Sequence, residues 1–207
     1  SDLDQFTAHT DVEFGRYRLR YGPYDVLLAL RGRHQVTNAM TAIHIAEQLN
    51  KSGWQIGKPA IEAGLSNTIW PGRLQLVEVS GIPARLLLDG AHNAAGAQVL
   101  REFLDEHCRN IPITMIFGTL RDKPPKEMAE ILFPAARKVI LTKANTPRAA
   151  EPQELAQSLA LLHNDIVCAG SLQEALAEAG RTTTRNELIV VCGSLYLVGE
   201  ALAFAGR

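Results

Sequence analysis

The sequence predicts an α/β protein with a mainly parallel, Rossmann-like sheet that helices cover on both faces. From residue 74 onward, short apolar segments of strand length alternate with longer amphipathic segments. This alternation is typical of βαβ units, which place helices on both faces of a parallel sheet. The chain has 207 residues, enough for one large domain or two small ones.

The part before residue 74 has a different pattern. Residues 12–30 favour a pair of strands, because apolar residues nearly alternate there and Gly22-Pro23 supplies a turn. Apolar residues then recur at helical spacing over 36–49, and a short second helix is expected at 61–65. The breaker-rich segment WPGR, residues 70–73, predicts a loop.

The second part alternates between the two kinds of element. Strands are expected at 74–79, 84–88, 113–117, 139–142, 166–168 and 188–192, and helices at 94–108, 126–132, 151–162, 171–179 and 194–204. Pro152 lies in the first turn of its helix, where a missing N–H costs nothing. Ser171 and Glu174 form a capping-box pattern at the start of the next helix.

Composition excludes several classes of protein. Hydrophobic residues make up 46% and charged residues 21%, as in ordinary globular proteins. The net charge of −1 gives no electrostatic reason to expect nucleic acid or an anionic membrane as a partner. No apolar run approaches the roughly 20 residues of a membrane span. Three well-separated cysteines and the absence of a signal-peptide pattern favour buried, reduced thiols and a cytoplasmic location.

In a parallel sheet, ligands bind beyond the carboxyl ends of the strands, so the residues there are the candidates for chemistry. The expected strand at 84–88 ends in Asp89-Gly90-Ala91-His92-Asn93. Asp89 can accept hydrogen bonds from ribose hydroxyls, and Asn93 can cap the helix that follows. The alternative is that Asp89 and Asn93 only tie off a turn.

Other polar residues occupy comparable positions. Lys123, after the strand at 113–117, can hold a carboxylate or phosphate, or lie in a solvated loop. Ser194, after the strand at 188–192, can bind a carboxylate or simply cap its helix. Arg73 is placed to contact phosphate or to form a surface ion pair, and Asn38 to contact a base edge or to cap a turn.

Several familiar motifs are missing from the sequence. It has no GxxxxGK[ST] phosphate loop, no GxGxxG and no GxSxG elbow. Its histidines and cysteines do not have the spacing of zinc ligands, so no metal site is predicted in this chain.

Taken together, the segments resemble a known family. HQ at 34–35 with NA at 38–39, WPGRL at 70–74, LDGAHN at 88–93, Gly118 with DK at 122–123, and GSLY at 193–196 occur in this order. They resemble the folylpolyglutamate synthases and dihydrofolate synthases of the Mur ligase superfamily, over nearly the whole chain from residue 28. The family segment often reads DGAHNP; here Ala94 replaces the proline, which removes no ligand group.

The resemblance implies a division into two parts. Residues 1–79 resemble the last part of an ATPase domain whose phosphate loop lies in a preceding N-terminal half. Residues 80–207 resemble a complete C-terminal glutamate-ligase domain. The missing N-terminal half is then a partner of this chain, and it would hold most of the Mg²⁺ ligands and the pterin site. The chain alone is expected to be inactive.

The resemblance also implies an activity in folate metabolism. ATP phosphorylates the carboxylate of a pteroate or folate, and the amine of L-glutamate attacks that acyl phosphate. Asn38 resembles the asparagine that meets adenine, Arg73 the arginine that reaches ATP phosphate, and Asp89 the ribose-binding aspartate. His92 and Ser194 look like glutamate-site residues, with Lys123 as a third; Arg73 and His92 are the expected catalytic pair.

Two other functions stay open at this point. The chain can belong to another Mur-type amino-acid ligase with a cell-wall nucleotide substrate, although DGAHN and HQ favour the folate enzymes. It can also act alone as a nucleotide- or amino-acid-binding module, since it lacks a phosphate loop. Whether the first glutamate, later ones or both are added depends on a pterin pocket that this sequence does not contain.

Overall fold

The computed structural model describes residues 6–206, which divide into two compact units between Trp70 and Pro71. The predicted boundary at 79/80 is later than the observed one. Strand β4 (Gln75–Val77) pairs antiparallel with β5 (Arg85–Leu88), so the chain has already entered the second unit's sheet. A boundary after residue 79 would therefore divide a hairpin.

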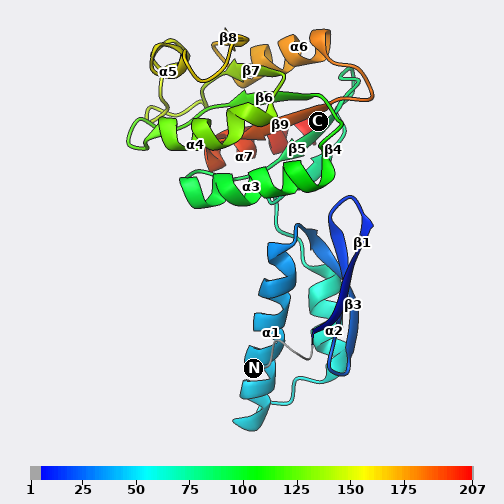
Figure 1. The fold of residues 1–207 in the computed structure, drawn as a ribbon. Helices are drawn as coiled ribbons and strands as arrows, with labels where there is room; N and C mark the ends of the chain where they lie inside the picture. The colour runs from blue at the N-terminus through cyan, green and yellow to red at the C-terminus, as the bar shows by residue number, and fades with distance from the viewer. Residues whose placement is uncertain (1–5, 207) are drawn as a thin grey trace. The chain divides into compact units, whose positions relative to one another are not determined.

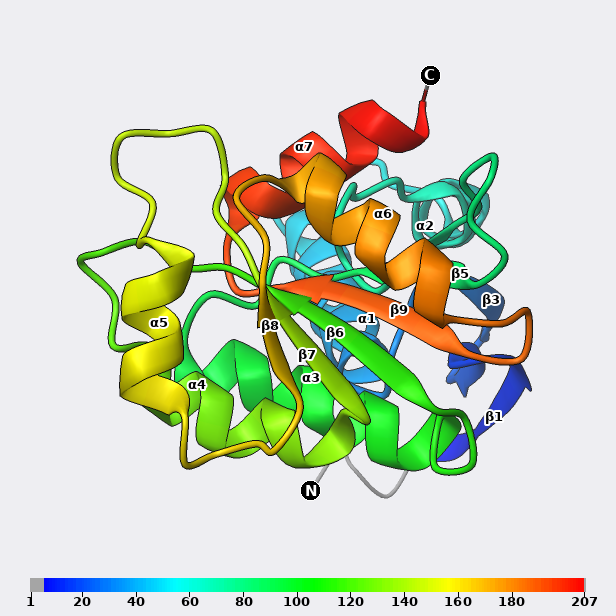
Figure 2. The same cartoon turned by 90° about the horizontal axis from the view of Figure 1, so that it is seen from above.

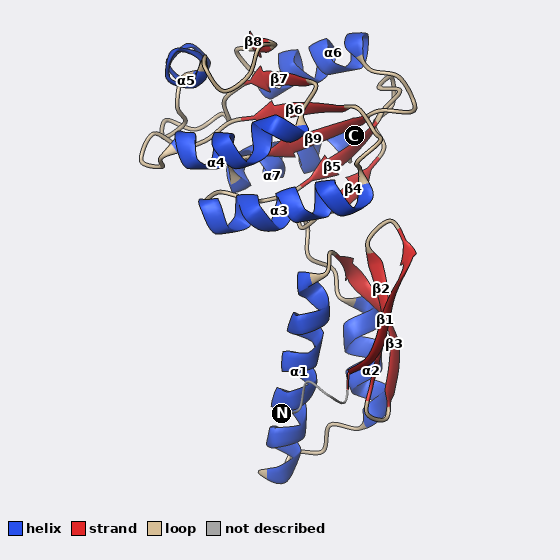
Figure 3. Cartoon of the chain, in the orientation of Figure 1, coloured by secondary structure: helices blue, strands red, loops and turns tan. Residues whose placement is uncertain are grey.

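The first unit packs two helices against a three-stranded antiparallel sheet (Figure 3). Its elements are β1 (Phe6–Glu13), β2 (Arg16–Tyr21), β3 (Tyr24–Arg31), α1 (His34–Lys51) and α2 (Lys58–Asn67). Tyr17 and Leu19 of β2 are buried against Ile43 of α1 and Ile61 of α2. Both predicted helices are present, and each is longer than predicted because polar residues at its ends carry no apolar signal.

The predicted pair of strands at 12–30 is a three-stranded meander instead. The chain turns at Phe14 and Gly15, whose φ angles are 41° and 77°. Two consecutive positive φ angles are what a two-residue type I′ hairpin requires. Phe14 is an unusual residue for such a position, and its apolar side chain made the segment look like continuous strand.

The second unit contains a six-stranded sheet with the order β4-β5-β9-β6-β7-β8 (Figure 1). The remaining strands are β6 (Ile113–Phe117), β7 (Lys138–Leu141), β8 (Ile166–Cys168) and β9 (Leu188–Cys192). From β5 to β8 all neighbours are parallel, and β4 is antiparallel at one edge. The predicted mainly parallel sheet is therefore confirmed.

Helices cover both faces of this sheet (Figure 2). They are α3 (Ala94–His107), α4 (Pro125–Leu132), α5 (Pro152–Leu159), α6 (Leu172–Thr182) and α7 (Leu195–Ala205), with a 3₁₀ turn at Phe133–Ala135. Helices α6 and α7 lie on one face, α3 and α4 lie on the other, and α5 packs beside β8. This arrangement buries both faces of the central strands, which explains their unbroken apolar sequences.

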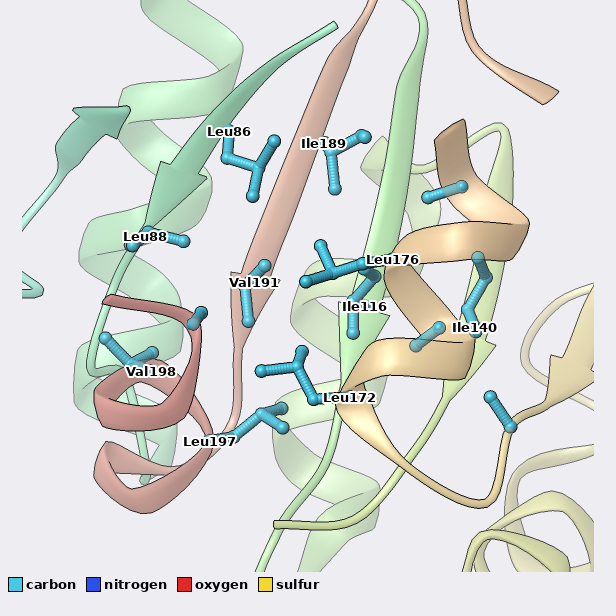
Figure 4. Packing of buried hydrophobic residues seen from close by; sticks show 14 of the residues in the cluster. Leu86, Leu88, Ile116, Ile140, Leu172, Leu176, Ile189, Val191, Leu197 and Val198 are labelled. Carbon is cyan, nitrogen blue, oxygen red and sulfur yellow. The ribbon is translucent and has the colours of Figure 1, made fainter. Parts of the chain in front are cut away.

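Figure 4 shows the core between the sheet and the helices α6 and α7. Alternate residues of the strands point to this side, such as Leu86 and Leu88 of β5 and Val191 of β9. They contact Leu176 of α6 and Leu197 of α7, and all five side chains are buried. The period-2 alternation of strand side chains thus selects which residues meet which helix layer.

The start of α6 confirms one capping residue and modifies the other. The Ser171 hydroxyl accepts a hydrogen bond from Glu174 N at 3.2 Å, as predicted. The Glu174 carboxylate accepts from Gly170 N at 2.8 Å, one residue before the N–H that a capping box uses. The helix then continues to Thr182, beyond its predicted end near 179.

The cysteines are all free thiols, but one of them is not buried. Cys108 and Cys192 are buried as predicted, whereas Cys168 is exposed. Cys168 lies on β8, an edge strand that has a neighbour on one side only. Within residues 6–206, no helix combines the length and the hydropathy needed to cross a bilayer.

Replacing Glu178 with glutamine should destabilise the second unit at neutral pH. Lys138 is nearly buried, and its Nζ donates to Glu178 Oε1 at 2.6 Å. Removing the carboxylate leaves a desolvated ammonium without its charged partner, a loss of about 1–3 kcal/mol in the free energy of unfolding. Chemical denaturation at pH 7 measures this loss.

The pH dependence of the Glu178→Gln effect has a defined sign. Hydrogen bonds from Lys138 and Arg181 hold the pKa of the Glu178 carboxyl below its usual value of 4.5. Its stabilisation is present above that value and is lost as the pH falls through the depressed pKa, so wild type and variant should converge in acid. Glu130→Gln is the control, because its Lys126 partner is exposed; equal losses in the two variants would contradict the prediction.

Candidate active site

Three loops meet at the carboxyl edge of the second unit's sheet. They follow β5, β9 and β6, and β9 lies between the other two strands. Gly193 N, after β9, donates to Ala91 O at 2.9 Å, and Gly118 N, after β6, donates to Cys192 O at 3.3 Å. The strand order changes direction here, which is where open α/β sheets bind ligands.

Two glycines allow these loops to approach closely. Gly193 has a φ of +102°, and a Cβ there would lie 2.6 Å from Gly118 O. A Cβ on Gly118 would collide with Thr142 O. Any larger residue at either position would push the strand ends apart, so the glycines are required by the packing of the backbone.

Asp89 is buried at the end of β5 with only 6% of its surface exposed. Its Oδ2 accepts from Leu74 N at 3.0 Å and its Oδ1 from Ala91 N at 2.9 Å. Burial raises the pKa of the Asp89 carboxyl, while these two N–H donors and the nearby charge of Arg73 oppose the rise. The carboxylate therefore joins two loops, which is the structural role given above as the alternative to ribose binding. Each carboxylate oxygen has a second lone pair that a ligand hydroxyl could use.

Arg73 lies in the loop that Asp89 holds. The neighbouring residues Gly72 and Leu74 both have positive φ angles, 72° and 45°. Gly72 O accepts from Gly90 N at 2.7 Å, and Gly72 N donates to Gln75 Oε1 at 2.9 Å. The backbone on both sides of Arg73 is thus fixed while its guanidinium is exposed, which suits the binding of an external anion.

His92 is exposed, and the backbone of its own loop orients the ring. His92 Nδ1 lies 2.8 Å from Gly90 O. A carbonyl oxygen only accepts, so Nδ1 carries the proton and Nε2 of the neutral ring is a hydrogen-bond acceptor. Asn93 caps α3 by accepting from Gly96 N at 2.8 Å, as its position in the sequence predicts.

Ser194 begins α7 and is 3% exposed. Its Oγ accepts a hydrogen bond from Tyr196 N at 3.2 Å, so the hydroxyl acts as a helix cap. Its own proton is still available for donation to a ligand. Ser194 is adjacent to Gly193, which bonds to Ala91 next to His92, so the structure brings Ser194, His92, Asp89 and Arg73 to one region.

Lys123 lies apart from that group, in the loop between β6 and α4. It lines a cavity of about 260 Å³ together with Thr119, Arg121, Glu154 and Ser158. Arg73, Asp89, His92 and Ser194 do not line this cavity.

Asn38 belongs to the first unit and is exposed on α1. Its Nδ2 donates to Gln35 Oε1 at 3.0 Å, and Gln35 Nε2 lies 2.9 Å from His34 Nε2. This chain of polar side chains fixes the orientation of the Asn38 amide.

One charged group at the same edge was not identified from the sequence. Lys143, after β7, bonds Glu151 at 2.8 Å, and Arg121, after β6, lies 3.5 Å from the same carboxylate. The hydrogen bond from Lys143 is the main reason that the pKa of Glu151 is lowered. Both cations follow predicted strands, so the rule that singled out Lys123 applies to them equally.

The sequence of the second unit matches a known protein family. The sequence profile described as the C-terminal domain of dihydrofolate synthetase matches residues 72–204. The chain belongs to this family.

Two relatives of known activity are longer than this chain. The dihydrofolate synthase/folylpolyglutamate synthase of Bacillus subtilis is 30% identical over 85% of this chain and 40% of that protein. The dihydrofolate synthetase of Saccharomyces cerevisiae is 29% identical over 88% of this chain and 46% of that protein. The chain thus spans less than half the length of these two relatives.

Solved structures in the family share the fold over nearly the whole chain. The folylpolyglutamate synthase of Thermotoga maritima matches 97% of this chain and 46% of its own, with a TM-score of 0.78 and 27% identity. That of Mycobacterium tuberculosis, complexed with ADP and AMPPCP, matches 98% of this chain and 48% of its own, with a TM-score of 0.83 and 25% identity.

The residues present fit part of a nucleotide site. Arg73 offers an exposed cation for phosphate, and Asp89 offers carboxylate oxygens for hydroxyls. Among residues 6–206, no three His, Cys, Asp or Glu side chains are grouped to hold a metal ion.

Substitution of Gly193 tests whether close backbone approach builds this edge. Gly193→Ala places a Cβ at positive φ and 2.6 Å from Gly118 O, and should cost at least about 1–3 kcal/mol in the free energy of unfolding. Gly199→Ala is the matched control: it lies in α7 with nothing within 4 Å, so alanine should be neutral or stabilise by up to about 1 kcal/mol. Urea denaturation of both variants measures the difference, and equal stabilities would contradict this account of the edge.

Proposed function

We propose that this chain forms the C-terminal part of an ATP-dependent ligase that adds L-glutamate to dihydropteroate or a folate through an acyl phosphate. One observation carries the proposal: the loop before β4 and the loops after β5 and β9 bring Arg73, Asp89, His92 and Ser194 to one edge of the sheet. The family membership and the activities of the B. subtilis and S. cerevisiae relatives support the same chemistry.

In this proposal the nucleotide lies toward Arg73 and Asp89. The guanidinium of Arg73 pairs with a phosphate, and the second lone pairs of Asp89 accept from ribose hydroxyls. The proposed role of Asn38 in binding adenine rests on the sequence resemblance alone. The M. tuberculosis neighbour, whose structure holds ADP and AMPPCP, supports a nucleotide site in the family. ATP, bound with Mg²⁺, supplies the phosphoryl group that activates the carboxylate.

Glutamate lies toward His92 and Ser194, with Lys123 as a more distant cation. The free Nε2 of His92 can accept a hydrogen bond from the glutamate ammonium, or take its proton when the amine becomes a nucleophile. Ser194 Oγ and the first turn of α7 can donate to a carboxylate. The protein forms no covalent bond in this scheme; it positions the amine and stabilises charge.

A fusion tests the proposed activity. The chain would replace the matching C-terminal portion of the B. subtilis relative, and release of ADP would be measured with dihydropteroate and L-glutamate. We expect ATP-dependent ligation by the fusion and none by the chain alone, because the sequence contains no phosphate loop. Ligation by the chain alone would contradict the second expectation, and turnover of a muramyl nucleotide instead of dihydropteroate would transfer the proposal to another Mur-type ligase.

Two substitutions in the fusion test the residue roles. Arg73→Gln should lower kcat by about 100-fold, as the loss of a charge-stabilising donor does. His92→Ala should raise the KM for glutamate about tenfold while the KM for ATP is retained. Arg109→Gln is the control, because that arginine lies in the loop before β6, at the opposite edge of the sheet. If Arg73→Gln and Arg109→Gln had the same kcat, Arg73 would not belong to the site.

A further inference from the structure

A cavity of the second unit lies outside the group formed by Arg73, Asp89, His92 and Ser194. It has a volume of about 760 Å³ and lies between the loop after β7, the start of α6 and the C-terminal half of α7. Lys123 does not line it, and neither do Arg73, Asp89, His92 and Ser194. It nevertheless opens at the carboxyl ends of β7 and β8, where this class of sheet binds ligands.

One wall of the cavity carries an excess of positive charge. Lys143 and Arg121 share the carboxylate of Glu151, so this group has two cations and one anion. Arg121 Nε also donates to Ala149 O at 3.0 Å, which fixes the guanidinium while its terminal nitrogens stay near the opening. More than a third of each cation's side chain is exposed, so a ligand carboxylate can join this cluster with little desolvation.

The remaining walls offer amide and apolar groups. Asn145 and Gln173 line the cavity with side-chain amides, beside the apolar side chains of Leu172 and Phe204. Glu200 also lines the cavity and keeps its negative charge; its Oε1 accepts from Asn145 N at 2.5 Å, which holds the carboxylate against that backbone. The walls thus suit a ligand that combines carboxylates, amide groups and methylenes.

The cavity is larger than a single amino acid requires. A volume of about 760 Å³ is within the range of about 300–1,000 Å³ that accommodates drug-sized molecules. A single glutamate would leave most of it filled with water, whereas a chain of several residues would fill more of it.

We propose that this cavity binds a γ-glutamyl chain, the tail already present on a folate that is about to be extended. The inference rests on the proposed function, since such a tail is the product of repeated glutamate addition. Its side carboxylates pair with Lys143 and Arg121, its amide bonds face Asn145 and Gln173, and its methylenes lie on Leu172 and Phe204. The cavity is separate from the residues proposed to form the new bond.

Titration of the full chain with tri-γ-glutamate tests the assignment directly. Backbone amide NMR shifts should change in a saturable way at residues 143–149 and 171–173. Lys143→Gln should weaken the affinity about tenfold, the effect of losing one charge-assisted hydrogen bond. Ala203→Trp, at an exposed position on the cavity wall, should abolish binding by occupying the space. Lys126→Gln is the control, an exposed lysine of α4 that pairs with Glu130 away from the cavity.

The remaining probes distinguish the sources of the ligand. L-Glutamate should bind at least about tenfold more weakly than tri-γ-glutamate, because it makes fewer contacts. Equal affinity for L-glutamate and tri-γ-glutamate would assign the cavity to the free amino acid. Equal affinity for α-linked triglutamate and tri-γ-glutamate would show that the cavity does not recognise the γ-linkage. Either result overturns the proposal. So would the absence of saturable shifts, or equal effects of Lys143→Gln and Lys126→Gln.

The binding test and the test of the proposed function can fail separately. Tri-γ-glutamate binding needs neither ATP nor ligation, whereas the fusion assay uses dihydropteroate, which has no glutamyl tail. An active fusion whose chain does not bind tri-γ-glutamate refutes only the tail subsite. In an active fusion, Lys143→Gln should raise the KM of a folate triglutamate and leave that of dihydropteroate unchanged, a difference that a general loss of structure would not produce.

Discussion

The buried carboxylate of Asp89 is the constraint on which the carboxyl edge depends. It accepts the N–H groups of Leu74 and Ala91, so one side chain joins the loop before β4 to the loop after β5. A charge taken out of water is unfavourable unless hydrogen bonds compensate it, and here both oxygens are compensated by rigid backbone donors. The consequence is geometric: Arg73 lies on one of the joined loops and His92 on the other. The same carboxylate that builds the edge is therefore also the group to which the proposed function assigns the ribose hydroxyls.

The position of β9 extends this constraint to the rest of the site. Because β9 lies between β5 and β6, its C-terminal loop is in contact with the loops of both neighbours. Gly193 and Gly118 have no side chains to keep those loops apart, and Ser194 is thereby placed beside the His92 loop at the start of α7. Strand order, which joins segments about a hundred residues apart, thus determines which polar residues can act together.

The sequence predicted the alternation of strands and helices because buried strands and amphipathic helices have distinct apolar periods. It did not predict the turn at Phe14, where positive φ is imposed by the hairpin and not by the residue type, or the exposure of Cys168, which depends on β8 being an edge strand. Asp89, His92, Lys123 and Ser194 were found because they follow strands, but grouping three of them required the strand order. Lys143 and Arg121 show the limit most clearly: each follows a strand, yet only the fold reveals that they share one carboxylate and line one cavity.

Arg121 lines both cavities at this edge, the one of about 260 Å³ that contains Lys123 and the one of about 760 Å³ that contains Lys143. Its bond to Ala149 O holds the guanidinium between them. The smaller volume is below the range of drug-sized ligands, whereas the larger lies within it. A change at Arg121 would therefore disturb both cavities, whereas changes at Lys123 and Lys143 would each disturb one. The two lysines, and not the arginine, are the positions at which the effects of these two cavities can be separated.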